Sequence, residues 1–140
     1  MSFRGRFPHN MDSKGRVVLP AKFREGLGES FVITKGLDDC LFAFTAQAFA
    51  ELEEKVKNLP LADEGVRKFV RFFFGEACDC ESDAQGRVVI PQYLREYAGI
   101  EKEVISIGLP GRVELWSKEK REDNGKFDKE IEKRMAELGI

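Results

Sequence analysis

Two stretches of the chain carry the same order of apolar and polar positions, 71 residues apart. Residues 12–20 read DSKGRVVLP, and residues 83–91 read DAQGRVVIP. The match extends through residues 23–25 against 94–96 and, after a one-residue insertion, reaches residues 44–45 against 116–117. A repeat that covers most of each half predicts two copies of one structural unit.

Each copy predicts the element order strand, strand, short helix, strand, strand. Its D-x-x-G segment predicts a tight hairpin turn, because aspartate caps such turns and glycine adopts the left-handed conformation. The apolar run after the turn predicts a largely buried second strand. Pro20 and Pro91 each begin a short helix, and Gly28 and Gly99 end it. In the first copy we expect this helix at residues 21–27 and strands at 31–35 and 41–45.

Apolar residues at helical spacing follow each copy. The pattern at positions 48, 49, 52, 56 and 59 predicts a helix over residues 46–58, and the Phe-rich residues 66–74 predict a second one. Residues 118–138 predict one charged, amphipathic final helix that packs either on its own chain or on a neighbour. Its apolar positions are Phe127, Ile131, Met135 and Leu138.

A unit of about 45 residues is too small to bury a core alone. We therefore expect the two copies to interleave as a pseudo-dimer within one globule. Residues 1–60 form the first repeat with its helix, and residues 61–140 form the linking helix, the second repeat and the C-terminal helix. The expected fold class is α+β, mostly β with appended helices and a tandem pseudo-two-fold.

Composition excludes several classes of protein. The chain is 42% hydrophobic and 34% charged, which is typical of a folded domain and not of a disordered or collagen-like one. No apolar stretch approaches a membrane span or a signal core, so we expect a cytoplasmic protein. Cys40, Cys78 and Cys80 are too few and too irregular for a disulfide framework, and with His9 as the single histidine no zinc site is expected.

Charge is distributed unequally between the repeats, although the net charge is only −2. Residues 1–28 contain six Lys or Arg against two Asp or Glu, whereas residues 72–99 contain two against five. Affinity for duplex DNA depends mainly on neutralising phosphates. We therefore predict that the first repeat faces DNA and that the second is a structural or assembly partner.

Arg16 is the leading candidate for reading a base. Asp12 can orient its planar guanidinium toward O6 and N7 of guanine in the major groove, where a two-stranded ribbon fits. The alternative is that Asp12 and Arg16 form only a brace inside the turn. That alternative would also explain Asp83 and Arg87 in the acidic repeat.

Other basic residues are expected to play lesser parts. Arg4, Arg6 and Lys14 are either phosphate contacts or ordinary solvated charges. Arg24 and Arg95 occur at equivalent positions of both repeats, which favours a shared structural salt bridge over a DNA contact.

The doubled D-x-x-G-R…P pattern, the opening FRGR at residues 3–6 and the P-x-x-x-R-E helices resemble the MraZ family, from residue 3 to residue 117. The family belongs to the AbrB/SpoVT superfamily of swapped-hairpin, double-psi-like barrels. The resemblance implies a nucleoid-associated transcriptional regulator of the division and cell-wall gene cluster, which binds short G-containing direct repeats of promoter DNA as an oligomeric ring. The DNA-binding residues are then expected to be Arg4, Arg6, Asp12, Lys14, Gly15, Arg16 and Arg87.

Other functions have less support. Carboxylates such as Asp12, Asp83, Glu76 and Glu81 are present, but the sequence has no Ser/His/Asp set, phosphate-cradling loop or nucleotide fingerprint. We therefore expect no enzyme activity, no cofactor and no metal. Two alternatives remain open: an antitoxin-like regulator of the same superfamily, and a structural oligomer without a DNA partner.

Overall fold

The computed structural model describes residues 2–140, which form eight strands and six helices. The α+β class is confirmed. In chain order the elements are β1 (Ser2–Asn10), β2 (Arg16–Val18), α1 (Ala21–Leu27), β3 (Ser30–Lys35), β4 (Leu41–Thr45), α2 (Ala46–Val56), α3 (Glu64–Phe73), β5 (Cys78–Glu81), β6 (Arg87–Val89), α4 (Gln92–Ala98), β7 (Glu103–Pro110), β8 (Arg112–Ser117), α5 (Lys118–Asn124) and α6 (Lys129–Glu137).

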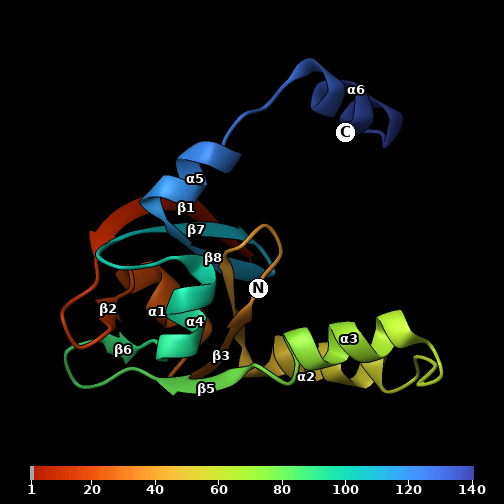
Figure 1. Ribbon diagram of the computed structural model, residues 1–140. Helices are drawn as coiled ribbons and strands as arrows, with labels where there is room; N and C mark the ends of the chain where they lie inside the picture. The colour runs from red at the N-terminus through yellow and green to blue at the C-terminus, as the bar shows by residue number, and fades with distance from the viewer. Residues whose placement is uncertain (1) are drawn as a thin grey trace.

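Strands from the two repeats pair with one another in both sheets (Figure 1). The larger sheet is antiparallel, with the order β1-β7-β8-β4-β3-β5. In it β1 of the first repeat pairs with β7 of the second, and β5 of the second pairs with β3 of the first. The remaining strands, β2 and β6, form a separate two-stranded ribbon. Each repeat thus supplies strands that the other repeat needs.

The β2–β6 ribbon covers one part of the core with alternate side chains. Val17 and Val88 are paired in register and are almost fully buried. Their neighbours Val18 and Val89 are 45% and 57% exposed. The prediction of a largely buried second strand was therefore wrong for these two positions, because successive residues of a strand point to opposite faces.

The short helices α1 and α4 begin and end where the sequence predicts. Pro20 and Pro91 precede them with φ of −50° and −55°, which suits the first turn of a helix. Gly28 and Gly99 end them with φ of +85° and +67°, a conformation that favours glycine. Each helix buries a large side chain against the shared core.

Helices α2 and α3 form a hairpin that projects from the sheet (Figure 1). The helix α2 ends at Val56, earlier than predicted, and α3 begins at Glu64 because the Asp63 side chain accepts the Val66 N–H. Phenylalanines fasten the base of the hairpin to the sheet. Phe44 of β4 packs on Phe49 and Phe73 at ring-centroid distances of 5.8 and 5.9 Å.

The single final helix predicted over residues 118–138 is wrong. The chain forms α5 and α6, separated by residues 125–128. Gly125 ends α5, and the Asp128 side chain caps α6 by accepting the Ile131 N–H at 3.0 Å. Figure 1 shows α6 standing away from the sheet. Among residues 2–140 there is no helix long and apolar enough to cross a membrane.

Candidate nucleic-acid interface

The first repeat turns sharply between β1 and β2. The Gly15 N–H donates to the Asp12 carbonyl at 3.1 Å, and the Asp12 N–H donates to the Arg16 carbonyl at 2.9 Å. Gly15 has φ of +75°, which explains the need for glycine there. The predicted tight turn is confirmed, but the strands it joins pair with β7 and β6 and not with each other.

The Asp12 carboxylate holds this turn and the Arg16 side chain together. Its Oδ1 accepts the N–H groups of Lys14 and Arg16, both at 2.9 Å, and its Oδ2 accepts Arg16 Nε at 2.7 Å. The hydrogen bond from the Arg16 backbone N–H, followed by the one from its guanidinium, lowers the pKa of Asp12. Asp12 is thus ionised at neutral pH and fixes the direction of the guanidinium.

The second repeat has the same turn with nearly the same distances. Asp83 Oδ1 accepts the N–H groups of Gln85 and Arg87 at 2.9 and 2.8 Å, and Oδ2 accepts Arg87 Nε at 2.7 Å. The Arg87 backbone N–H is the main cause that lowers the pKa of Asp83. The brace that sequence analysis offered as an alternative is therefore present in both repeats.

The brace leaves the outer part of each guanidinium open. Both ion pairs use Nε, and within residues 2–140 the Nη nitrogens of Arg16 and Arg87 have no hydrogen-bond partner. The two arginine side chains are 24% and 32% exposed. Bracing and ligand binding are thus compatible functions of one side chain, because they use different nitrogens.

Each turn also rests on an arginine from the other repeat. Arg24 and Arg95 each donate Nε, at 2.9 Å, to the carbonyl of the residue before the helix-starting proline. A Cβ on Gly86 would overlap Arg24, and a Cβ on Gly15 would lie 2.9 Å from the guanidinium carbon of Arg95. The predicted salt bridge is wrong: within residues 2–140 these arginines form no ion pair, and they hold backbone carbonyls instead.

The ribbon brings the two braced arginines onto one surface. In the β2–β6 pairing Arg16 lies opposite Val89, and Val18 lies opposite Arg87. Opposite residues share a face, as do residues two apart in a strand. Arg16 and Arg87 are therefore diagonal neighbours, for which the typical separation is about 7–8 Å. We call the outward surface formed by Arg16, Val18, Arg87 and Val89 the ribbon face.

The other predicted contacts lie at different distances from the ribbon face. Lys14 is exposed in the first turn, next to Arg16. Arg4 and Arg6 are exposed on β1, an edge strand of the larger sheet. Arg6 lies four positions before Asn10, the last residue of β1, which is about 13 Å along the strand. The structure thus brings Lys14 close to Arg16 and places Arg4 and Arg6 on a separate strand.

Comparisons with known proteins agree with this duplicated architecture. The family model described as "MraZ protein, putative antitoxin-like" matches residues 2–72 and again residues 73–135. A protein of Acetivibrio thermocellus named "Transcriptional regulator MraZ" is 53% identical, with 99% of each chain covered. Proteins of the same name from Caldicellulosiruptor bescii and Clostridium beijerinckii are 55% and 54% identical over at least 97% of each chain. The chain belongs to the MraZ family.

Sequence reasoning missed two residues of the ribbon face in this MraZ-family chain. Val18 and Val89 were expected in the core, yet they lie beside the arginines at the surface. The signal was present in the sequence, because each is preceded by a valine and followed by a large aliphatic residue. A strand that buries the outer two must expose the middle one.

The remaining titratable groups of this MraZ-family chain show no centre for metal chemistry. Within residues 2–140 no three His, Cys, Asp or Glu side chains are grouped to hold a metal ion. Burial raises the pKa of the Cys80 thiol to about 12, so it stays protonated. Burial lowers the pKa of His9, whose Nε2 bonds the Ser106 hydroxyl. These groups are thus part of the packed sheet.

Proposed function

We propose that this MraZ-family chain is a transcriptional regulator that binds double-stranded DNA through the ribbon face. The observation that carries the proposal is the pair of equivalent turns at residues 12–16 and 83–87. These turns present two arginines on one surface, and each arginine is held by an aspartate. The relatives named as transcriptional regulators support regulation of transcription as the outcome of binding.

The bracing suits the reading of bases. Asp12 and Asp83 hold Nε of Arg16 and Arg87, which leaves the Nη groups to donate to O6 and N7 of guanine. A guanidinium that is already oriented loses less conformational freedom when it binds. A two-stranded ribbon is narrow enough to enter the major groove. In this mechanism Lys14, Arg4 and Arg6 neutralise phosphates beside the groove and carry no base specificity.

Assembly supplies the affinity that one chain lacks. The excess of four positive charges in residues 1–28 is a weak anchor at physiological salt. We propose that the protein, built as a swapped-hairpin barrel, forms a homo-oligomeric ring through head-to-tail contacts. Several ribbon faces then engage short G-containing direct repeats, with a gain in avidity. The regulated promoter is that of the division and cell-wall gene cluster, and the protein is cytoplasmic and nucleoid-associated.

The test is a binding titration of the full chain by fluorescence anisotropy. The probes are a duplex that the protein selects from a random-sequence library and a scrambled duplex of the same composition, each between 50 and 200 mM salt. We expect the selected duplex to bind roughly 10³-fold more tightly or better, with affinity for both falling as salt rises. Equal affinity for the two duplexes would contradict the proposal.

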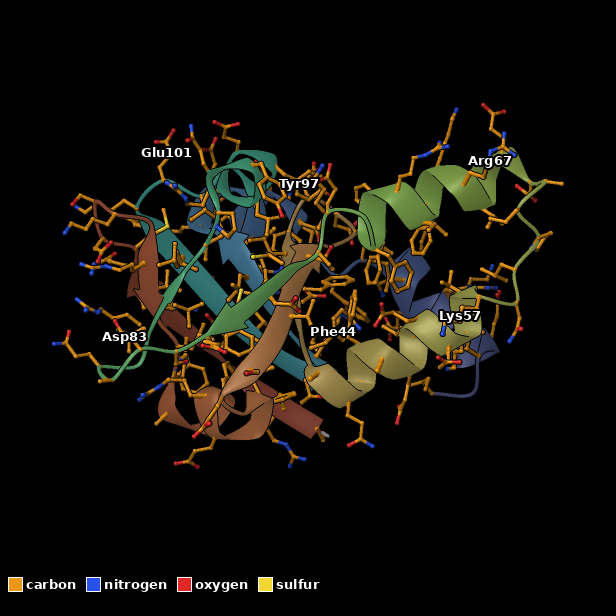
Figure 2. The ribbon with its side chains drawn as sticks, turned by 90° about the horizontal axis from the view of Figure 1, so that it is seen from below. Phe44, Lys57, Arg67, Asp83, Tyr97 and Glu101 are labelled. Carbon is orange, nitrogen blue, oxygen red and sulfur yellow. The ribbon has the colours of Figure 1, made fainter. Side chains whose placement is uncertain are left out.

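A matched pair of variants locates the binding surface. Arg16→Ala removes a cation from the ribbon face, whereas Lys57→Ala removes one from the far end of the α2–α3 hairpin. Figure 2 shows Lys57 at the side of the molecule opposite Asp83 and its turn. We expect only Arg16→Ala to weaken binding, and a comparable loss in Lys57→Ala would place the DNA elsewhere.

A further inference from the structure

The two valines of the ribbon face are unusual for an outward-facing pair of strands. Val18 and Val89 are 45% and 57% exposed, although outward positions of such strands are ordinarily polar. A single exposed apolar residue needs no explanation. Here, however, the same apolar residue stands at equivalent positions of both repeats and next to both braced arginines.

The register fixes which valine accompanies which arginine. Val89 lies directly opposite Arg16, and Val18 lies directly opposite Arg87. Such pairs have Cβ atoms about 4.5–5.5 Å apart. Each arginine of this face thus has an apolar neighbour at a spacing comparable to one or two base steps, since bases of one strand are spaced about 3.4 Å apart.

The major groove offers one apolar group to match. Thymine presents its C5-methyl group there, next to its O4 acceptor, and apolar side chains contact this methyl in known complexes. We propose that Val18 and Val89 contact thymine C5-methyl groups, so that the ribbon recognises thymine close to the guanines bound by Arg16 and Arg87. This inference rests on the proposed function, because it assigns a second element of specificity to the same face.

The positive charge of the ribbon face favours DNA as its binding partner over a second copy of the chain. An interface formed by two copies of this face would place Arg16 and Arg87 against the same arginines of the second copy, which offer like charge and no acceptor to the Nη groups. Burying such groups without acceptors is costly. A DNA groove offers acceptors and methyl groups together.

The experiment removes only the methyl group. In the selected duplex each thymine near the bound guanines is replaced, one at a time, by deoxyuridine, and binding is measured by anisotropy. We expect the natural protein to bind about fourfold more weakly for each contacted methyl that is lost. Val18→Ser and Val89→Ser should bind the thymine duplex about fourfold more weakly and should each lose discrimination at one position.

Leu37→Ser is the matched control, because Leu37 is also 57% exposed but lies in the segment between β3 and β4. It should retain full discrimination between thymine and deoxyuridine. Thermal unfolding and sedimentation of all variants check that the fold and the assembly are intact.

The outcomes separate the two proposals. If the natural protein prefers the selected duplex but binds thymine and deoxyuridine equally, the thymine contact is wrong while the proposed function stands. If it shows no preference for the selected duplex, the proposed function itself fails. The inference is overturned if the valine variants bind the thymine and deoxyuridine duplexes more weakly by the same factor. It is also overturned if they lose assembly but still discriminate thymine from deoxyuridine. In either case the valines support the structure or an interface.

Discussion

The two D-x-x-G-R turns are nearly identical in geometry and differ in their electrostatic surroundings. Corresponding hydrogen bonds of Asp12 and Asp83 agree within 0.1 Å. Lys14 in the first turn, however, corresponds to Gln85 in the second. The surrounding residues 1–28 and 72–99 have opposite net charge. Geometry has therefore been kept in both repeats, and charge has not.

This comparison shows that the brace does not depend on the charge of the repeat that contains it. The brace needs only aspartate, glycine and arginine, and it forms equally well in the acidic repeat. The ribbon also places Arg87 on the same face as Arg16. The asymmetry between the repeats therefore lies in the charge around each arginine and not in whether the arginine reaches the surface.

The largest expected effect comes from removing one arginine at a time. Arg16→Ala should weaken binding to the selected duplex by about 1–3 kcal/mol, the range for a bidentate contact to guanine, and should relax the sequence preference. Arg87→Ala should cost less, because fewer cations surround it to hold the phosphates. Anisotropy titrations of both variants measure the difference.

Thermal unfolding provides the control for this pair. Both variants should remain folded, because the arginine side chains are partly exposed and the backbone bonds of each turn persist. Equal losses of affinity at the two positions would contradict the prediction that the first repeat contributes more than the second to DNA binding. Loss of the fold in Arg16→Ala would mean that the brace is the main function of the pair.

The extent to which the sequence predicted this structure depended on whether the signal was local. The helix at residues 21–27 and the strand at 41–45 were correct, because proline, glycine and apolar periodicity act within a few residues. The break at Gly125 also had a local signal, since Asp128 stands at a typical capping position before α6. The regular apolar spacing begins only at Phe127, after Gly125, so it supports α6 alone and gave no reason to extend one helix back to residue 118.

Strand pairing could not be predicted in the same way. A hairpin turn normally implies that the strands on either side pair with each other, but β1 and β2 pair with strands of the second repeat. This choice depends on the fit of the whole core and not on the turn. The joint position of Arg16 and Arg87 follows from that pairing, so it could be seen only in the structure.

A second prediction concerns the glycines of the two turns. Gly15→Ala and Gly86→Ala should each lower the free energy of unfolding by about 1–2 kcal/mol, because both glycines have positive φ. Gly86→Ala should cost more, since its Cβ also overlaps Arg24. Denaturant unfolding measures the two values.

The added cost at Gly86 can be assigned with a second substitution. Combining Gly86→Ala with Arg24→Ala removes the overlapping guanidinium, so the two changes should cost less together than the sum of their separate costs. Strict additivity would show that Arg24 moves aside freely and that the backbone conformation accounts for the whole loss.

A third prediction exchanges the residue that distinguishes the turns. Lys14→Gln should reduce the steepness of the salt dependence of log affinity by about 0.9 for each phosphate contact removed, with little change in sequence preference. Gln85→Lys should make the dependence steeper by a similar amount if the second turn also lies near the DNA backbone. An unchanged slope in Gln85→Lys would place that turn away from the phosphates.

The smallest effect is expected from pH, and it should be the same for both turns. The pKa values of Asp12 and Asp83 are lowered in the folded protein, chiefly by the backbone N–H groups of Arg16 and Arg87. A carboxyl group with a lowered pKa stabilises the fold fully above its unfolded pKa and loses that contribution as pH falls through its folded pKa. Neither turn should therefore change between pH 5 and 8, and both should loosen only below about pH 4. Carboxyl chemical shifts followed by NMR measure this directly, and titration of only one aspartate near pH 5 would show that the two braces are not equivalent.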